Sequence, residues 1–247
     1  MNKWKAQDGW KPPPPTMNAV EIPKDESARD KLARLYGAEL QQKPTFGVLW
    51  REGRVAKLEL PRNGLEGAVP PQLEALEKCR VICLFGNRLN GRLDGARLPA
   101  SLVHLDLSSN RIDGPVPAEI ARLRRLRRLH LQGNRLSGPL PDVFDALEAL
   151  EEFTAQRNRL SGPLPPSIGA CAALRKLFLH ENPKLKGPVP PAWADCGKLA
   201  QVLLAETAVT AGSAPPALAA RCDVQISPPV PKDDRPPRDT VVEAAEA

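Results

Sequence analysis

The sequence predicts an α/β-type solenoid, a superhelix in which about seven short repeats stack and share one continuous core. Three observations predict this fold: an asparagine that recurs at a nearly constant period, a pair of alternating leucines before it, and a glycine and a proline after it. The chain has 247 residues, of which 42% are hydrophobic but only 4% aromatic. Aliphatic side chains must therefore fill most of the core.

The asparagines set the period of the repeat. They are Asn63, Asn87, Asn110, Asn134, Asn158 and Asn182, and Thr207 occupies the same place in a degraded last copy. The steps between successive positions are 24, 23, 24, 24, 24 and 25 residues. A period of this length is typical of stacked-repeat proteins.

Each repeat is expected to contribute one short strand to a parallel sheet. Leucines or apolar variants precede the asparagine by five and three residues, as Leu129 and Leu131 precede Asn134. Alternate residues of a strand share a face, so both side chains point into the core. A glycine such as Gly138 permits positive φ or close backbone approach, and a proline such as Pro141 ends the segment. The residues expected to cover the core from the convex side are Ile120, Phe144, Ile168 and Trp193.

The pattern resembles the plant-type leucine-rich repeat, LxxLxLxxNxLxGxIP, of receptor-kinase ectodomains and polygalacturonase-inhibiting proteins. The resemblance covers roughly residues 54–212, although the second copy, "NGRLDGARLPASL", has no proline at the matching place. It implies short parallel strands on a concave face, a 3-10 or irregular convex side, and a ladder of asparagine side chains bonded to turn backbone. It also implies a non-catalytic role in recognition.

A single repeat cannot bury its own face, so caps are expected at both ends. Residues 25–53 are expected to form a helical N-cap, because Ser27 and Asp30 have capping-box spacing and apolar residues follow at helical intervals. Residues 213–226 are expected to form the C-cap. The Pro-rich tails 1–24 and 227–247 have the composition of disorder.

Cysteine usage and the N-terminus favour a cytoplasmic protein. The five cysteines form no CxxC pair and no apparent disulfide framework. The paired cap cysteines of secreted members of the resembled family are missing. The segment "MNKWKAQDGWKPPPP" has no apolar core of a signal peptide, and no run long enough to span a membrane occurs. A longer natural N-terminus would favour secretion instead. Cys79 and Cys171 are expected to be small buried hydrophobes.

The outward residues of the strands line the concave face, where solenoids bind partners. Five positive and five negative side chains fall on this face: Lys57, Arg62, Arg128, Arg157 and Lys176 against Glu59, Asp106, Glu152, Glu181 and Glu206. A neutral face favours a protein partner over nucleic acid. Exposed apolar residues, in one rung of Val81, Cys83 and Phe85 and a second of Phe178 and Leu203, are expected contact anchors. The predicted partner-binding residues are Val81, Cys83, Phe85, Asp106, His130, Gln132, Phe178, His180 and Leu203.

His104, Asp106 and His130 fall on adjacent predicted strands. Such residues could bind a metal or perform acid–base chemistry. Beside the pair of Asp106 and His130, no third ligand has strong spacing in the sequence, and an open face excludes little water. We therefore prefer a polar cross-strand pair of Asp106 and His130. We therefore predict no metal, cofactor, small-molecule substrate or catalytic residue.

The net charge of +6 and the pI near 9.2 raise the question of where the excess positive charge lies. The segment "ARLRRLRRLH" predicts a basic strip on the flank or convex side, formed by Arg122, Arg124, Arg125, Arg127 and Arg128. The leading hypothesis is a monomeric adaptor or scaffold that binds a protein, without membrane insertion or nucleic acid. Two alternatives stay open: a secreted receptor-like or enzyme-inhibitor protein, and binding of RNA or an anionic surface through the strip.

Overall fold

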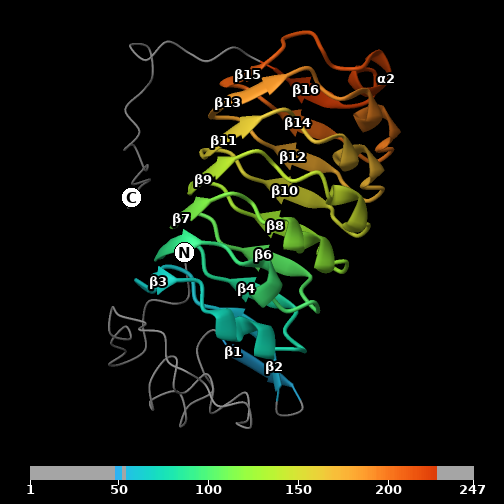
Figure 1. Cartoon of the computed structure of the whole chain (residues 1–247). Helices are drawn as coiled ribbons and strands as arrows, with labels where there is room; N and C mark the ends of the chain where they lie inside the picture. Colours follow the sequence, from blue (N-terminus) through green and yellow to red (C-terminus); the bar gives the residue numbers. More distant parts are fainter. Residues whose placement is uncertain (1–47, 52–53, 227–247) are drawn as a thin grey trace, which may run out of the picture.

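The computed structural model describes residues 48–51 and 54–226. The chain winds as a solenoid in which a typical repeat supplies a strand of one sheet, a strand of a second sheet and a short helix (Figure 1). The first sheet has the strand order β1-β2-β4-β6-β8-β10-β12-β14-β16, and the second has the order β15-β13-β11-β9-β7-β5-β3. The predicted solenoid is confirmed.

The first sheet is built from the strands that carry the paired leucines. Its parallel strands are β2 (Arg54–Glu59), β4 (Val81–Cys83), β6 (His104–Asp106), β8 (Arg128–His130), β10 (Glu152–Thr154), β12 (Lys176–Phe178), β14 (Gln201–Leu203) and β16 (Asp223–Gln225). At the first end, β1 (Val48–Arg51) pairs antiparallel with β2. The alternation holds, since the central residue of β8, Leu129, is fully buried while Arg128 and His130 face outward. The outward residues of this sheet are the concave face referred to below.

The second sheet was not expected from the sequence. Its strands follow the recurrent asparagine and are β3 (Glu66–Ala68), β5 (Arg88–Arg92), β7 (Arg111–Gly114), β9 (Arg135–Gly138), β11 (Arg159–Gly162), β13 (Asn182–Gly187) and β15 (Thr207–Val209). A buried residue such as Leu136 anchors these strands to the core, except in β3, where none of the three residues is buried. The recurrent glycine has positive φ, for example 80° at Gly138, which a side chain would strain.

Short 3-10 helices form the side of each repeat opposite the second sheet (Figure 1). They are η2 (Pro71–Ala75), η3 (Gly95–Arg97), η4 (Ala118–Arg122), η5 (Phe144–Ala146), η6 (Pro166–Ala170) and η7 (Pro191–Asp195). The side chains expected to cover the core, Ile120, Phe144, Ile168 and Trp193, are all fully buried. Within the described residues no helix has the length and apolar character needed to cross a bilayer.

Only part of the expected caps can be compared with the structure. Most of the predicted helical N-cap (residues 25–53) and both predicted tails lie outside the described residues. The described part of the N-cap is the strand β1. Residues 213–226 contain α2 (Pro216–Ala219) and β16, which adds a strand to the first sheet beyond the last repeat. The C-terminal segment therefore continues the sheet as well as covering the core with Leu218.

The cysteines pack as small apolar residues. All five are free thiols, and only Cys83 is not buried. Burial raises the pKa of Cys79 to about 11 and that of Cys171 to about 12. Both thiols are therefore protonated at neutral pH, as expected for core positions.

Candidate functional site

A ladder of buried asparagines holds the concave strands in register. Asn158 shows the pattern: its Oδ1 accepts a hydrogen bond from the Leu136 amide at 2.9 Å, and its Nδ2 donates to the carbonyls of Leu131 and Ala155 at 3.0 Å. Equivalent bonds are made by Asn87, Asn110, Asn134 and Asn182. At the first position Asn63 instead donates to the Pro61 carbonyl at 3.0 Å, because no described repeat precedes it. The ladder satisfies backbone groups that the buried turns would otherwise leave unpaired.

The chain leaves seven strands of the first sheet, from β2 to β14, through a residue in the left-handed region. Sequence analysis missed this turn, although glycine occupies two of its seven positions. The φ values run from 52° to 69° at Arg62, Gly86, Ser109, Gly133, Arg157, Glu181 and Glu206. Five of these are not glycines, which are uncommon at positive φ. The repeated turn gives every repeat the same exit angle and so sets the edge of the concave face.

The two apolar rungs are half-buried, which corrects the expectation that they are exposed. The guanidinium carbon of Arg62 lies 5.4 Å from the centroid of the Phe85 ring, within the range of a cation–π contact. At the second rung the centroids of the Phe178 and His180 rings lie 6.3 Å apart. Both rungs therefore keep only part of their apolar surface for a partner.

Charged residues of the concave face pair with one another across neighbouring strands. Arg157 Nε lies 2.7 Å from Glu181 Oε1, and Lys176 Nζ lies 3.2 Å from Glu152 Oε1. Burial acts to raise the pKa of Glu152, but Lys176 and then Arg128 outweigh it and hold this pKa below its usual value. Exposed pairs of this kind stabilise a fold by at most about 1 kcal/mol each. Their main effect is to keep the face locally neutral.

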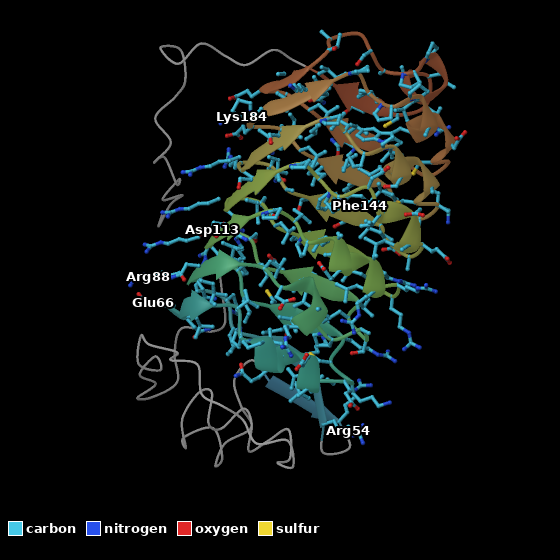
Figure 2. The ribbon with its side chains drawn as sticks, viewed as in Figure 1. Arg54, Glu66, Arg88, Asp113, Phe144 and Lys184 are labelled. Atoms are coloured by element: carbon cyan, nitrogen blue, oxygen red, sulfur yellow. The ribbon has the colours of Figure 1, made fainter. Side chains whose placement is uncertain are left out.

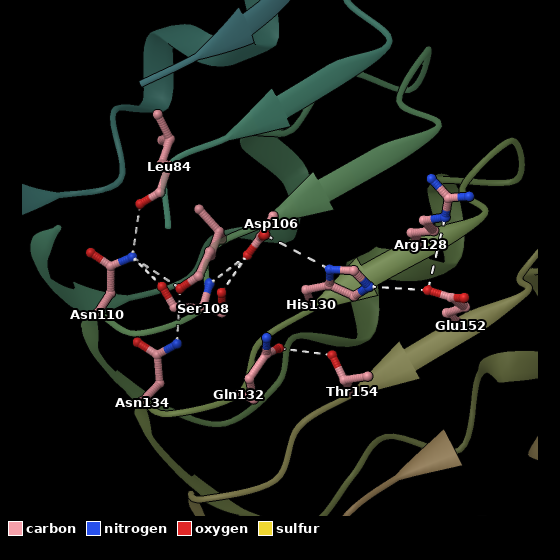
Figure 3. A network of polar contacts seen from close by, with 11 residues as sticks. Leu84, Asp106, Ser108, Asn110, Arg128, His130, Gln132, Asn134, Glu152 and Thr154 are labelled. Carbon is pink, nitrogen blue, oxygen red and sulfur yellow. Dashed lines mark hydrogen bonds and ion pairs between the residues drawn. The ribbon is translucent and has the colours of Figure 1, made fainter. Parts of the chain in front are cut away.

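The centre of the concave face is a polar network (Figure 3). Asp106 and His130 are lateral neighbours on β6 and β8, as the period predicts. His130 Nδ1 lies 3.8 Å from Asp106 Oδ2, and His130 Nε2 lies 3.5 Å from Glu152 Oε2. The Thr154 hydroxyl donates to Gln132 Oε1 at 2.7 Å. Thr154 and Ser108 are buried, and each hydrogen-bonds a polar neighbour of the network.

His104 sits against this network and keeps a buried, unpaired nitrogen. Its ring meets the His130 ring edge to face, with centroids 5.2 Å apart. Within the described part of the chain, His104 Nε2 is buried and has no hydrogen-bond partner. Burial, and then the charge of His130, lowers the pKa of His104. The ring is therefore neutral at pH 7.

The structure divides the predicted basic strip. Arg128 lies on β8 and contacts Glu152 on the concave face, at 3.8 Å. Arg127 Nη1 lies 3.5 Å from Glu151, and Arg122 Nη1 donates to the Ala96 carbonyl at 2.9 Å. Arg124 and Arg125 are exposed and have no ion pair among the described residues. The strip is therefore not one continuous patch.

A larger basic surface lies on the second sheet, and sequence analysis missed it. In five successive repeats a basic residue follows the recurrent asparagine, after an intervening Pro183 in the last of them. All five are exposed: Arg88, Arg111, Arg135, Arg159 and Lys184. Figure 2 shows Arg88, Asp113 and Lys184 along the same edge of the ribbon. Arg92 and Lys186 add charge, while the acidic side chains of these strands are Glu66 and Asp113. We call these exposed basic residues the basic face. The signal in the sequence was the Asn-Arg pair in four successive repeats.

Comparisons with known proteins agree with this architecture. The family model described as Leucine Rich Repeat matches residues 101–123 and 125–147. No curated protein matches the sequence.

Several solved structures match at comparable levels. The structure of PEPR1-AtPEP1 is 28% identical with a TM-score of 0.58, over 66% of this chain and 22% of that chain. A second match is the ectodomain of the plant membrane receptor kinase GASSHO1/SCHENGEN3 from Arabidopsis thaliana, in complex with CASPARIAN STRIP INTEGRITY FACTOR 2. It is 25% identical with a TM-score of 0.58, and the match covers 82% of this chain and 30% of that chain. The ectodomain of the receptor kinase SOBIR1 from Arabidopsis thaliana is 28% identical with a TM-score of 0.56, and the match covers 67% of this chain and 98% of that chain.

The chain spans less than a third of the length of the first two of these chains, and almost all of the third. The family model covers two adjacent repeats at the centre of the solenoid, where the asparagine ladder is complete. The chain thus has the fold of a leucine-rich-repeat solenoid, with two repeats that match the family model, and it is similar in structure to ectodomains of plant receptor kinases.

Proposed function

We propose that the protein is a non-catalytic recognition module, an adaptor or scaffold, that binds a protein or peptide on its concave face. The observation that carries the proposal is the layout of that face: a polar centre around Asp106 and His130 lies between two half-buried apolar rungs. Apolar anchors within a polar, locally neutral surface suit a protein partner. The GASSHO1/SCHENGEN3 ectodomain, of similar fold, is in complex with CASPARIAN STRIP INTEGRITY FACTOR 2, which supports this class of partner.

The concave face can be tested with a double substitution that removes one anchor from each rung. The full chain is used as bait, and partners captured by the wild type are quantified against Phe85→Ala/Phe178→Ala. Truncating central anchors typically weakens an interface by at least about 2 kcal/mol, so recovery of the partner should fall about tenfold or more. Circular dichroism melting of each bait checks that it is folded.

The matched control is Val69→Ala/Val143→Ala. These two valines are also half-buried and packed against the core, but they lie outside the first sheet. The control should recover the same partner as the wild type. Equal losses in the two variants, or no loss in either, would move the binding surface away from the apolar rungs.

Binding of a polyanion is a second candidate function, and the basic face favours it. Its arginines follow one another on adjacent strands β5, β7, β9 and β11. Among these arginines, Arg88 forms an ion pair with a described residue, since its Nη1 lies 2.9 Å from Glu66 Oε1. The register staggers these arginines, because Arg111 lies opposite Asn90, Arg135 opposite Asp113 and Arg159 opposite Ser137. The arginines therefore form a slanted row across the sheet, along which successive anionic groups of a polyanion would lie. This surface is better suited to a polyanion than the divided strip around Arg124.

The second candidate can be separated from unspecific charge effects by two triple variants. Arg111→Gln/Arg135→Gln/Arg159→Gln removes three charges from the basic face, and Arg124→Gln/Arg125→Gln/Arg175→Gln removes three exposed charges elsewhere. Affinity for a single-stranded RNA oligonucleotide is measured by fluorescence anisotropy at several salt concentrations. The first variant should lower the slope of log K against log salt by about 2, since each phosphate contact contributes about 0.7. Equal losses in both variants would reject a dedicated face.

A further inference from the structure

Three potential metal ligands meet at the centre of the concave face. His104 and Asp106 both project outward from β6, because alternate residues of a strand share a face. His130 lies beside Asp106 on β8. The ligating atoms of the three side chains all lie within 4.8 Å of one another, and all three residues are half-buried. The group therefore brings together two imidazoles and one carboxylate on a rigid sheet.

Ser108 holds one of the two oxygens of the Asp106 carboxylate in place. The Ser108 amide and hydroxyl donate to Asp106 Oδ1 at 2.9 Å and 2.6 Å. The other oxygen, Oδ2, faces the His130 ring. Burial acts to raise the pKa of Asp106, but the contacts with His130 and Ser108 outweigh it and leave this pKa below its usual value. Asp106 is therefore ionised at neutral pH and presents its second oxygen to the group, in a fixed position beside His130.

Glu152 is placed to orient His130. The two ring nitrogens of His130 face two different carboxylates, Nδ1 toward Asp106 and Nε2 toward Glu152 at 3.5 Å (Figure 3). A metal-bound imidazole usually donates its remaining N–H to a carboxylate, which fixes the ring and its tautomer. Arg128 and Lys176 both contact Glu152, and no ion pair joins either of them to Asp106 in the described structure. The charge of Asp106 therefore remains available for a cation.

His104 supplies the observation that the polar pair of Asp106 and His130 does not explain. Its Nε2 is buried without a hydrogen-bond partner among the described residues, and buried polar atoms in proteins are generally satisfied. The ring is half-buried and lies edge to face with His130. A neutral imidazole in this position offers an uncommitted nitrogen to a ligand that the neighbouring acid and imidazole would share.

We propose that His104, Asp106 and His130 form a binding site for a divalent transition metal ion of the zinc type, with Ser108 and Glu152 as its orienting shell. Two imidazoles and one carboxylate are a donor set that zinc accepts in tetrahedral geometry, leaving the fourth position open. The open position faces outward from the concave face, where a water or a side chain of a bound partner completes the coordination. The structure shows the polar pair of Asp106 and His130 that the sequence predicts, and the proposal adds a bound cation to that pair.

The test is titration of the metal-free full chain with zinc ions in a calorimeter. We expect one ion per chain in the wild type. His104→Ala and His130→Ala should each weaken binding more than about 100-fold, since even loss of an orienting residue typically costs about 10–100-fold. Ser108→Ala, which removes one of the two bonds to Asp106 Oδ1, should weaken binding about 10-fold.

Two control variants separate this site from other zinc-binding groups. His180→Ala removes the third histidine of the chain. Cys83→Ser removes a thiol on β4, where Cys83 is the lateral neighbour of Asp106. Both should bind zinc like the wild type. Because the chain has three histidines, NMR gives a separate readout: zinc should shift the imidazole signals of His104 and His130 but not those of His180.

Three outcomes would overturn the proposal. They are the absence of zinc binding at micromolar concentrations, binding that survives both His104→Ala and His130→Ala, and binding that is lost in Cys83→Ser or His180→Ala. Circular dichroism melting of the metal-free proteins distinguishes a lost site from a lost fold.

Discussion

Replacing Asn158 with alanine is expected to lower the free energy of unfolding by about 3–5 kcal/mol. The substitution removes the acceptor for the Leu136 amide and the donors for the carbonyls of Leu131 and Ala155. Asn158 is buried, so water cannot readily replace it. Each unsatisfied buried group typically costs about 1–3 kcal/mol. Urea unfolding followed by circular dichroism measures the loss.

The bonds of Asn158 join one repeat to the next, so the unfolding curve should also change shape. A solenoid is stabilised by contacts between neighbouring repeats, and weakening one interface can separate the array into parts that unfold independently. The matched control is Asn90→Ala. Asn90 is an exposed asparagine on β5 without a side-chain hydrogen bond among the described residues, and its substitution should change stability by less than about 0.5 kcal/mol. A loss below about 1 kcal/mol at Asn158 would contradict the argument.

The period and the paired leucines were enough to predict the first sheet, because each strand carries its own signal of a buried residue between two outward ones. The second sheet carries no such signal. Its strand β9 contains one buried residue, Leu136, and ends at Gly138 with positive φ. The pairing of Arg159 with Ser137 comes from the stacking of neighbouring repeats. A local pattern of four residues cannot reveal a sheet that stacking creates.

The sequence predicts which residues of the site are lateral neighbours, but not how their side chains contact one another. A constant period places Asp106 beside His130 without any knowledge of side-chain conformation. Exposure depends on contacts from the adjacent repeat or the adjacent turn, and these are not visible in the sequence. Arg62 lies over the ring of Phe85, and Ser108 turns onto Asp106. The unpaired nitrogen of His104 likewise follows from burial, so the observation that favours the proposed metal site comes from the structure and not from the sequence.

Close stacking of two repeats on the side of the 3-10 helices depends on Gly169 in η6. This residue is buried and does not have positive φ. A β-carbon at Gly169 would lie 2.5 Å from the carbonyl carbon of Ala192 in η7, and closer still to its oxygen. The constraint is therefore the space between two backbones and not the conformation of one. Neighbouring Trp193 is fully buried, and its Nε1 donates to the Pro165 carbonyl at 3.0 Å.

Gly169→Ala is accordingly expected to lower the free energy of unfolding by about 3 kcal/mol. The added methyl group meets backbone, so η7 must move, and the packing and hydrogen bond of Trp193 must change with it. The matched control is Gly197→Ala, at an exposed glycine without positive φ, where a β-carbon would meet nothing within 4 Å. That substitution should be neutral or stabilise the fold by about 0.4–1 kcal/mol, because alanine restricts the unfolded chain. Urea unfolding of both variants measures the two effects. A loss of stability in Gly169→Ala without a loss in Gly197→Ala would locate the cost in the contact between η6 and η7. Equal stability of the two variants would show that these helices can separate freely.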